Sequence, residues 1–96
     1  MAGELIWSRT ALDDIEAIAG WIARDSMTHA RDLVERIVAR SEALLTETSR
    51  PQLLLDLDAI RVLERPLEGF RILYERHGDD LHLLAVIHRD GAQPAN

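Results

Sequence analysis

Residues 69–88 read GFRILYERHGDDLHLLAVIH, and this stretch decides the class of fold. The segments Gly69–Arg76 and Leu81–His88 are rich in alternating or apolar residues, as strands are, and His77–Asp80 between them is typical of a turn. The run Leu83–Ile87 is apolar on both faces, which indicates an interior strand rather than an edge strand. The sequence therefore predicts an antiparallel pair of strands inside a sheet.

A third strand is predicted just before this pair. Ala59–Arg65 has the composition of a strand, and the turn-like Pro66–Gly69 separates it from the next one. Together the three segments predict an antiparallel meander. We expect Leu53–Asp58 to be a linker whose apolar residues cover an edge of the core, and Gly91–Asn96 to be a loose tail.

The first half of the chain predicts two helices. Apolar residues recur every three or four positions over Ala11–Asp25 and again over His29–Thr48, as on one stripe of an amphipathic helix. Serines and threonines that can cap a helix precede both segments. Because the break Asp25–Thr28 is short, the helices should form an antiparallel hairpin. A short apolar strand, Glu4–Ser8, comes before them.

The predicted fold class is therefore α+β, with the order β-α-α-β-β-β. The helical hairpin packs on one face of a small, mainly antiparallel sheet. The other face is left open for a site or a partner. At 96 residues the chain is expected to form a single domain over residues 1–96.

Composition excludes several classes of site. The chain has no cysteine, so disulfides, thiolate metal sites and cysteine nucleophiles are excluded. Its net charge is −6 and its 11 basic residues are all arginine, which disfavours general binding of nucleic acid. No apolar run approaches the roughly 20 residues of a membrane helix, so we expect a cytoplasmic protein without membrane contact.

Several segments match the order and spacing of a known family. In the segment Trp7–Ile22, the end of a strand is followed by a short polar segment, an alanine, two acidic residues and then the apolar stripe of a helix. An arginine-bearing strand, Arg61–Leu63, is followed after a turn by Gly69–Tyr74, and the apolar strand Leu84–Arg89 closes the pattern with a histidine before its last residue. These segments resemble the ParE/RelE toxin superfamily, with Phe70 in place of the usual first tyrosine of its "tyrosine-arginine-isoleucine-x-tyrosine" strand.

The resemblance covers about residues 5–90 and is nearer to the ParE branch than to RelE. It implies the toxin of a type II toxin–antitoxin system, of the kind associated with plasmid stabilization, in a hetero-oligomer with a cognate antitoxin. The toxin would bind and inhibit a bacterial target, by family analogy DNA gyrase. The alternatives are a RelE-like ribosome-dependent messenger RNA endoribonuclease and an inactive relic or interaction module that only binds an antitoxin.

The residue inventory favours inhibition by binding over catalysis. The RelE branch often uses lysines, which this chain lacks, and Asp90-Gly91 stand where the family usually has another basic residue. If the chain is a nuclease, the candidate groups are two arginines as phosphate clamps and a tyrosine or histidine as the base: Arg61, Arg71, Tyr74 and His88. The structural interpretation of the same residues is that the arginines pair with Glu64, Glu75 or backbone and that Tyr74 belongs to the core. No cofactor is expected.

The binding surfaces can also be assigned to residues. We expect the target to be contacted by Arg61, Arg71 and Arg89. The antitoxin would lie as an extended or helical segment across the hairpin or the sheet and contact Trp21, Leu53 and Leu54.

A metal site in the second half of the chain is rejected. The candidate ligands would be His77, Asp79, Asp80 and His82. A turn already explains the aspartates, and nothing in the sequence forces the two histidines, which lie on opposite sides of that turn, to converge.

Overall fold

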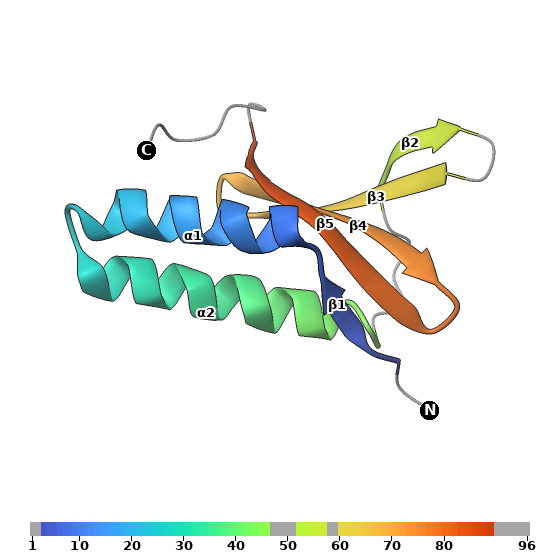
Figure 1. The fold of residues 1–96 in the computed structure, drawn as a ribbon, viewed down its shortest axis with the longest axis horizontal. Helices are drawn as coiled ribbons and strands as arrows, with labels where there is room; N and C mark the ends of the chain where they lie inside the picture. Colours follow the sequence, from blue (N-terminus) through green and yellow to red (C-terminus); the bar gives the residue numbers. More distant parts are fainter. Residues whose placement is uncertain (1–2, 47–51, 58–59, 90–96) are drawn as a thin grey trace.

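Two helices lie beside one sheet (Figure 1). The computed structural model describes residues 3–46, 52–57 and 60–89, and of residues 52–57 and 60 it describes the backbone alone. The sheet has five strands in the order β1-β5-β4-β3-β2, of which only β1 is parallel to its neighbour. The elements are β1 (Leu5–Trp7), α1 (Arg9–Ala23), α2 (Met27–Ala43), β2 (Gln52–Leu57), β3 (Ile60–Leu67), β4 (Phe70–His77) and β5 (Asp80–His88).

The predicted fold class is confirmed, with one strand more than expected. The prediction of a linker over Leu53–Asp58 is wrong, because Gln52–Leu57 forms β2 and pairs antiparallel with β3. The register shifts between Leu53 and Leu55, so β2 contains an irregularity of the bulge kind. A bulge adds a residue and breaks the two-residue alternation by which a strand is predicted. The predicted tail Gly91–Asn96 lies outside the described residues.

Strand β3 also runs further than predicted, through Pro66 to Leu67. Its pairing with β2 ends at Glu64, so the missing N–H of Pro66 costs no hydrogen bond on that side of the ladder. The turn to β4 consists of Glu68 and Gly69, with φ of 46° and 90°, which matches the two-residue hairpin turns with two positive φ angles. An ion pair from Arg36 to Glu68 ties this turn to α2.

The caps of the helical hairpin follow the predicted signals. The Ser8 hydroxyl accepts from the Ala11 N–H at 2.9 Å, and the Ser26 hydroxyl accepts from the His29 N–H at 3.1 Å. At the other end of α2, the Arg76 guanidinium donates to the Leu44 carbonyl at 3.1 Å. A side chain of β4 therefore satisfies a carbonyl that the helix leaves free.

Helix α1 is also fastened to β5 through polar groups. The Ser8 hydroxyl donates to the Leu84 carbonyl, and the Asp14 carboxylate accepts from the Val86 N–H, each at 2.9 Å. Near these contacts the register between β5 and β4 shifts by one residue. The pairing of β5 with β1, which is three residues long, has also ended there. The polar step and the acidic pair of the sequence thus satisfy backbone groups that the sheet leaves unpaired.

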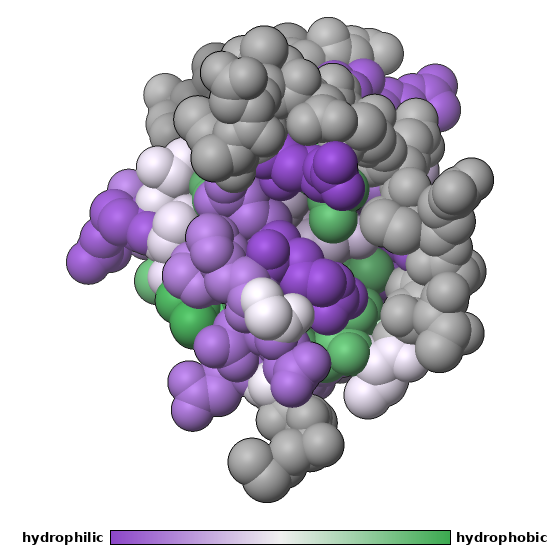
Figure 2. Space-filling view, turned by 90° about the vertical axis from the view of Figure 1, so that its right-hand side faces the viewer, coloured by the Kyte–Doolittle hydropathy of each residue, from purple (hydrophilic) through white to green (hydrophobic). Residues whose placement is uncertain are grey.

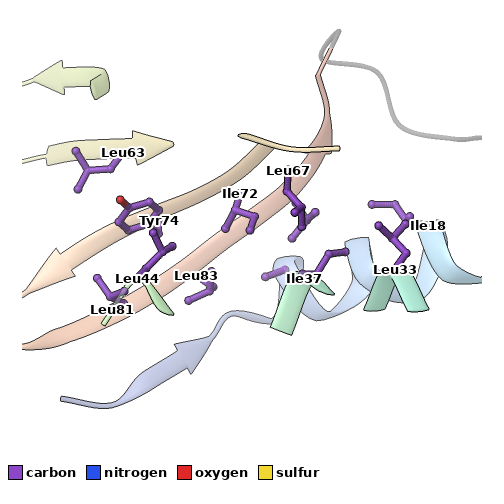
Figure 3. Packing of buried hydrophobic residues seen from close by; sticks show 12 residues of the cluster. Ile18, Leu33, Ile37, Leu44, Leu63, Leu67, Ile72, Tyr74, Leu81 and Leu83 are labelled. Carbon is purple, nitrogen blue, oxygen red and sulfur yellow. The ribbon is translucent and has the colours of Figure 1, made fainter. Parts of the chain in front are cut away.

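The core lies between the helical hairpin and one face of the sheet (Figure 3). Trp7 is half-buried and packs against it. Two apolar residues within the predicted helical segments, Leu12 and Val38, lie outside this core and are exposed to 46% and 36%. The buried apolar residues of the cluster are Ala11, Ile18, Leu33, Ile37, Leu44, Leu63, Leu67, Ile72, Tyr74, Leu81, Leu83 and Val86.

Candidate functional site

An apolar groove of about 480 Å³ runs between α1 and α2. Small residues line it from α1, namely Ala19, Gly20 and Ala23, and they are turned away from Ile18, which faces the core. Helix α2 contributes larger apolar residues, and charged side chains of both signs complete the lining. The residues from α2 and the charged residues are Met27, Ala30, Val34, Glu16, Arg31 and Glu35.

Gly20 leaves open space in the groove because it has no side chain. A Cβ built on Gly20 meets no atom within 4 Å, so nothing in the described chain requires a glycine there. A glycine inside a helix costs about 1 kcal/mol relative to alanine. The isolated chain therefore gains nothing from this position, and the open space above it suits a group from another molecule. The sequence alone does not single out Gly20, because a glycine in a helical pattern indicates only a weak helix former.

Other exposed apolar side chains also lie on the helical hairpin. Met27, at one end of the groove, is 64% exposed, and Trp21, the neighbour of Gly20, is 48% exposed. Trp21 is therefore accessible to a partner at the place where the sequence assigns antitoxin contact. Leu53 and Leu54, assigned to the same contact, lie in β2, where the side chains are outside the described residues.

A partly buried ion pair lies on the sheet face that the helices do not cover. Arg71 alternates with Ile72, which is fully buried in the core, so its side chain points to the opposite face. There its guanidinium lies 3.5 Å from the carboxylate of Glu64, whose side chain is only 6% exposed. The structural interpretation of Arg71, pairing with a nearby glutamate, is confirmed. The pair also holds the Arg71 side chain on this face of the sheet.

The three arginines assigned to the target do not all come together. Arg89 donates its backbone N–H to the Gly69 carbonyl at 2.8 Å, which places it at the same end of the sheet as Arg71. Pro66 lies opposite Arg71, and Arg61 is five residues earlier on β3, about 17 Å along the strand. By strand alternation Arg61 also shares the face of Leu63, which is the helix-facing side.

The candidate catalytic groups are likewise separated. Tyr74 is 2% exposed and lies in the core, paired across the strands with Leu63 and Leu83 (Figure 3). His88 lies at the far end of β5, where its ring packs edge-on against Phe70 with centroids 5.6 Å apart. Arg71 points to the other face of the sheet, so these groups do not converge on one point.

The two histidines of the β4–β5 turn are closer than the sequence suggested. The rings of His77 and His82 are 4.2 Å apart, so the two side chains come together although nothing in the sequence required it. His77 also lies 3.6 Å from the carboxylate of Glu75. Within residues 3–46, 52–57 and 60–89, however, no group of three or more histidines and carboxylates is placed to hold a metal ion.

The two ends of the molecule differ in polarity. Figure 2 shows the end that carries the β4–β5 turn, where the coloured residues are mostly hydrophilic with small apolar areas between them. The apolar groove lies elsewhere, between the two helices. Neither described helix is long and apolar enough to span a membrane.

Comparison with models of protein families identifies one family for this chain. A family model described as "ParE toxin of type II toxin-antitoxin system, parDE" matches residues 5–92. A solved structure described as "Chromosomal ParDE TA system from P. aeruginosa" is similar at 18% identity with a TM-score of 0.58, over 92% of this chain and 96% of that chain. That likeness shows the fold. No curated protein sequence matches the chain.

Proposed function

Because the chain belongs to the ParE toxin family of type II toxin–antitoxin systems, we propose that it inhibits a bacterial target by binding it and that a cognate antitoxin neutralises it. By family analogy the target is DNA gyrase. The observation that carries the proposal is the presence of two distinct surfaces, an apolar groove on the helices and an arginine pair at one end of the sheet. Inhibition by binding needs a complementary surface and no set of converging catalytic groups.

The antitoxin is assigned to the helical hairpin. Its groove is apolar and open, and such patches on small domains mark interfaces with proteins. A groove between two helices with small residues on one wall suits an amphipathic helix better than an extended strand, because backbones approach closely over glycine and alanine. Trp21 lies outside the groove lining and is exposed on another side of α1, where it offers the antitoxin a second contact on the hairpin.

The target is assigned to the arginine end of the sheet. Arginine is enriched among the residues that dominate binding energies at interfaces. Glu64 fixes the guanidinium of Arg71, so less side-chain entropy is lost when a partner binds it. Arg89 adds a second, exposed cation beside it, and Arg61 belongs to the surface only if the target also reaches the helix-facing side of β3.

A supercoiling assay with purified DNA gyrase tests the proposal. We expect the chain to inhibit supercoiling and its candidate antitoxin, encoded by a neighbouring gene, to relieve the inhibition. The matched variant carries Arg61→Gln, Arg71→Gln and Arg89→Gln, and it should bind the antitoxin but no longer inhibit. If the folded chain leaves gyrase active while messenger RNA is cleaved in expressing cells and Arg71→Ala abolishes the cleavage, the toxin is an endoribonuclease. If expression is harmless and only antitoxin binding remains, the chain is an inactive relic. Either result contradicts the proposal.

A further inference from the structure

We propose that the outer face of the β4–β5 hairpin binds a zinc ion through the imidazoles of His77 and His82 and the carboxylate of Glu75. The site lies beside the β4–β5 turn, whereas Arg71 and Arg89 lie toward the β3–β4 turn at the other end of the sheet. It uses no residue of the helical groove. The inference therefore goes beyond the proposed function and does not depend on it.

The three side chains share one face of the hairpin. On β5, His82 stands between Leu81 and Leu83, which are fully buried in the core, so His82 points to the face that the helices leave uncovered. Glu75 is the register partner of His82, which places their Cβ atoms about 4.5–5.5 Å apart. His77 is two residues further along β4 than Glu75 and therefore shares this face. Three side chains of metal-binding type thus lie side by side.

The distances between these groups suit a tetrahedral ion. The Nε2 atom of His77 is 3.6 Å from Oε1 of Glu75. Two ligand atoms at roughly 2.0–2.1 Å from a tetrahedral zinc ion are about 3.4 Å from each other, so this pair already spans nearly one edge of the tetrahedron. The ring centroid of His82 is 4.2 Å from that of His77. Two imidazoles and a carboxylate are a ligand set that zinc uses in proteins.

The ring of His82 has to turn before all three groups meet at one ion. In the arrangement of the described residues, no group of three histidines and carboxylates is ready to hold a metal. The χ2 torsion of a histidine has a broad energy profile, and His77 and His82 are both partly exposed, so their rings can turn at little cost. Three protein ligands leave the fourth position of a tetrahedral ion to water or to a group of another molecule.

The neighbours of the site narrow the ligand set. Asp80 accepts the Glu4 N–H through Oδ1 at 2.8 Å, so its carboxylate is already used to fasten the start of β1 to the hairpin. On the other side of His82, its register partner Ile6 is 39% exposed on the same face. An apolar side chain beside a ligand limits the access of water to the metal. The ligand set therefore excludes the turn aspartate.

Isothermal titration calorimetry with Zn²⁺ alone tests the proposal, and Mg²⁺ is the control ion because it prefers an octahedron of oxygen ligands. We expect one Zn²⁺ per chain with a dissociation constant on the order of micromolar, and no binding of Mg²⁺. At a hundredfold excess of free Zn²⁺ over this constant, the midpoint of thermal unfolding should rise by roughly 10 °C.

Single substitutions test the ligand set. His77→Gln, His82→Gln and Glu75→Gln should each weaken zinc binding at least about tenfold, since the loss of even an outer partner of a zinc ligand costs that much. All three side chains lie on the uncovered face, so circular dichroism should show an unchanged fold. Two controls should bind zinc as the wild type does: His29→Gln, an exposed histidine of α2, and Asp80→Asn, whose Oδ1 still accepts a hydrogen bond.

A folded chain that binds no Zn²⁺ at about 1 mM overturns the proposal. So does zinc binding that any of the three ligand substitutions leaves intact, or that either control weakens as much as they do. None of these results bears on inhibition of the target, which the supercoiling assay measures separately.

Discussion

The helical groove and the arginine end of the sheet are two surfaces that the core leaves free, and they are made in opposite ways. The groove is defined by what is missing, because Gly20 and two alanines leave space that nothing in the described chain fills. The sheet surface is defined by a charged group held in place, because the buried carboxylate of Glu64 fixes Arg71. A hollow selects a partner by shape, and a fixed cation selects it by charge. Two partners can therefore be recognised independently by one small domain.

The largest expected effect concerns the arginine end. Arg71→Gln combined with Arg89→Gln should raise the concentration for half-inhibition of the target about a hundredfold, whereas Arg61→Gln alone should change it about threefold or less. The difference follows from the position of Arg61, five residues along β3 and on the other face. A supercoiling titration of both variants measures it. If Arg61→Gln raised the concentration for half-inhibition as much as the double variant does, the target surface would extend along the whole of β3.

Removing one partner of the Arg71–Glu64 ion pair should destabilise the chain more than replacing both partners by apolar residues. Glu64→Ala should lower the free energy of unfolding by about 2 kcal/mol, less than for a fully buried pair because the side chain of Arg71 is 26% exposed. Replacing both groups by apolar residues, Glu64→Leu with Arg71→Met, should leave stability unchanged or raise it and still abolish target binding. Urea unfolding curves measure the first quantity. A double variant that is as unstable as Glu64→Ala would show that the pair serves the fold rather than orienting Arg71.

A larger side chain in the groove should weaken antitoxin binding and leave inhibition of the target unchanged. Gly20→Leu meets no neighbour at its Cβ and improves helix propensity, so the free chain should be stabilised by up to about 1 kcal/mol. Antitoxin affinity, measured by calorimetry, should fall at least about tenfold because the hole is occupied. Inhibition of the target should stay at the wild-type level. Unchanged antitoxin affinity would place the antitoxin elsewhere on the chain.

The smallest effect is expected where α1 meets β5. Asp14→Ala removes the acceptor of the Val86 N–H and should cost about 1 kcal/mol of stability without altering either binding surface. Asp13→Ala is the matched control, since its carboxylate is exposed and lies 3.6 Å from Arg9 in a surface pair. Such pairs contribute little, so thermal unfolding should separate the two variants. Equal stability of both would mean that water replaces the Asp14 acceptor.

The sequence predicted the elements better than the surfaces. Periodicity is a local property, so it located the helical hairpin and the strands of the meander, and it failed at β2 where the register shift breaks the alternation. The helical stripe marked Leu12 and Val38 as apolar but could not show that they face outward. The separation of Arg61 from Arg71 depends on the pairing of β3 with β4, and the space above Gly20 depends on the packing of two helices. Both are properties of the assembled fold.

In the proposed function, target and antitoxin bind at separable surfaces. A gyrase supercoiling titration, with and without antitoxin, tests it on the wild-type chain, Gly20→Leu and the Arg71→Gln, Arg89→Gln variant. We expect Gly20→Leu to inhibit in full and to escape relief by the antitoxin, and the arginine variant to bind antitoxin without inhibiting. If each variant loses inhibition and antitoxin binding together, target and antitoxin share one surface and the proposal of separate surfaces is wrong.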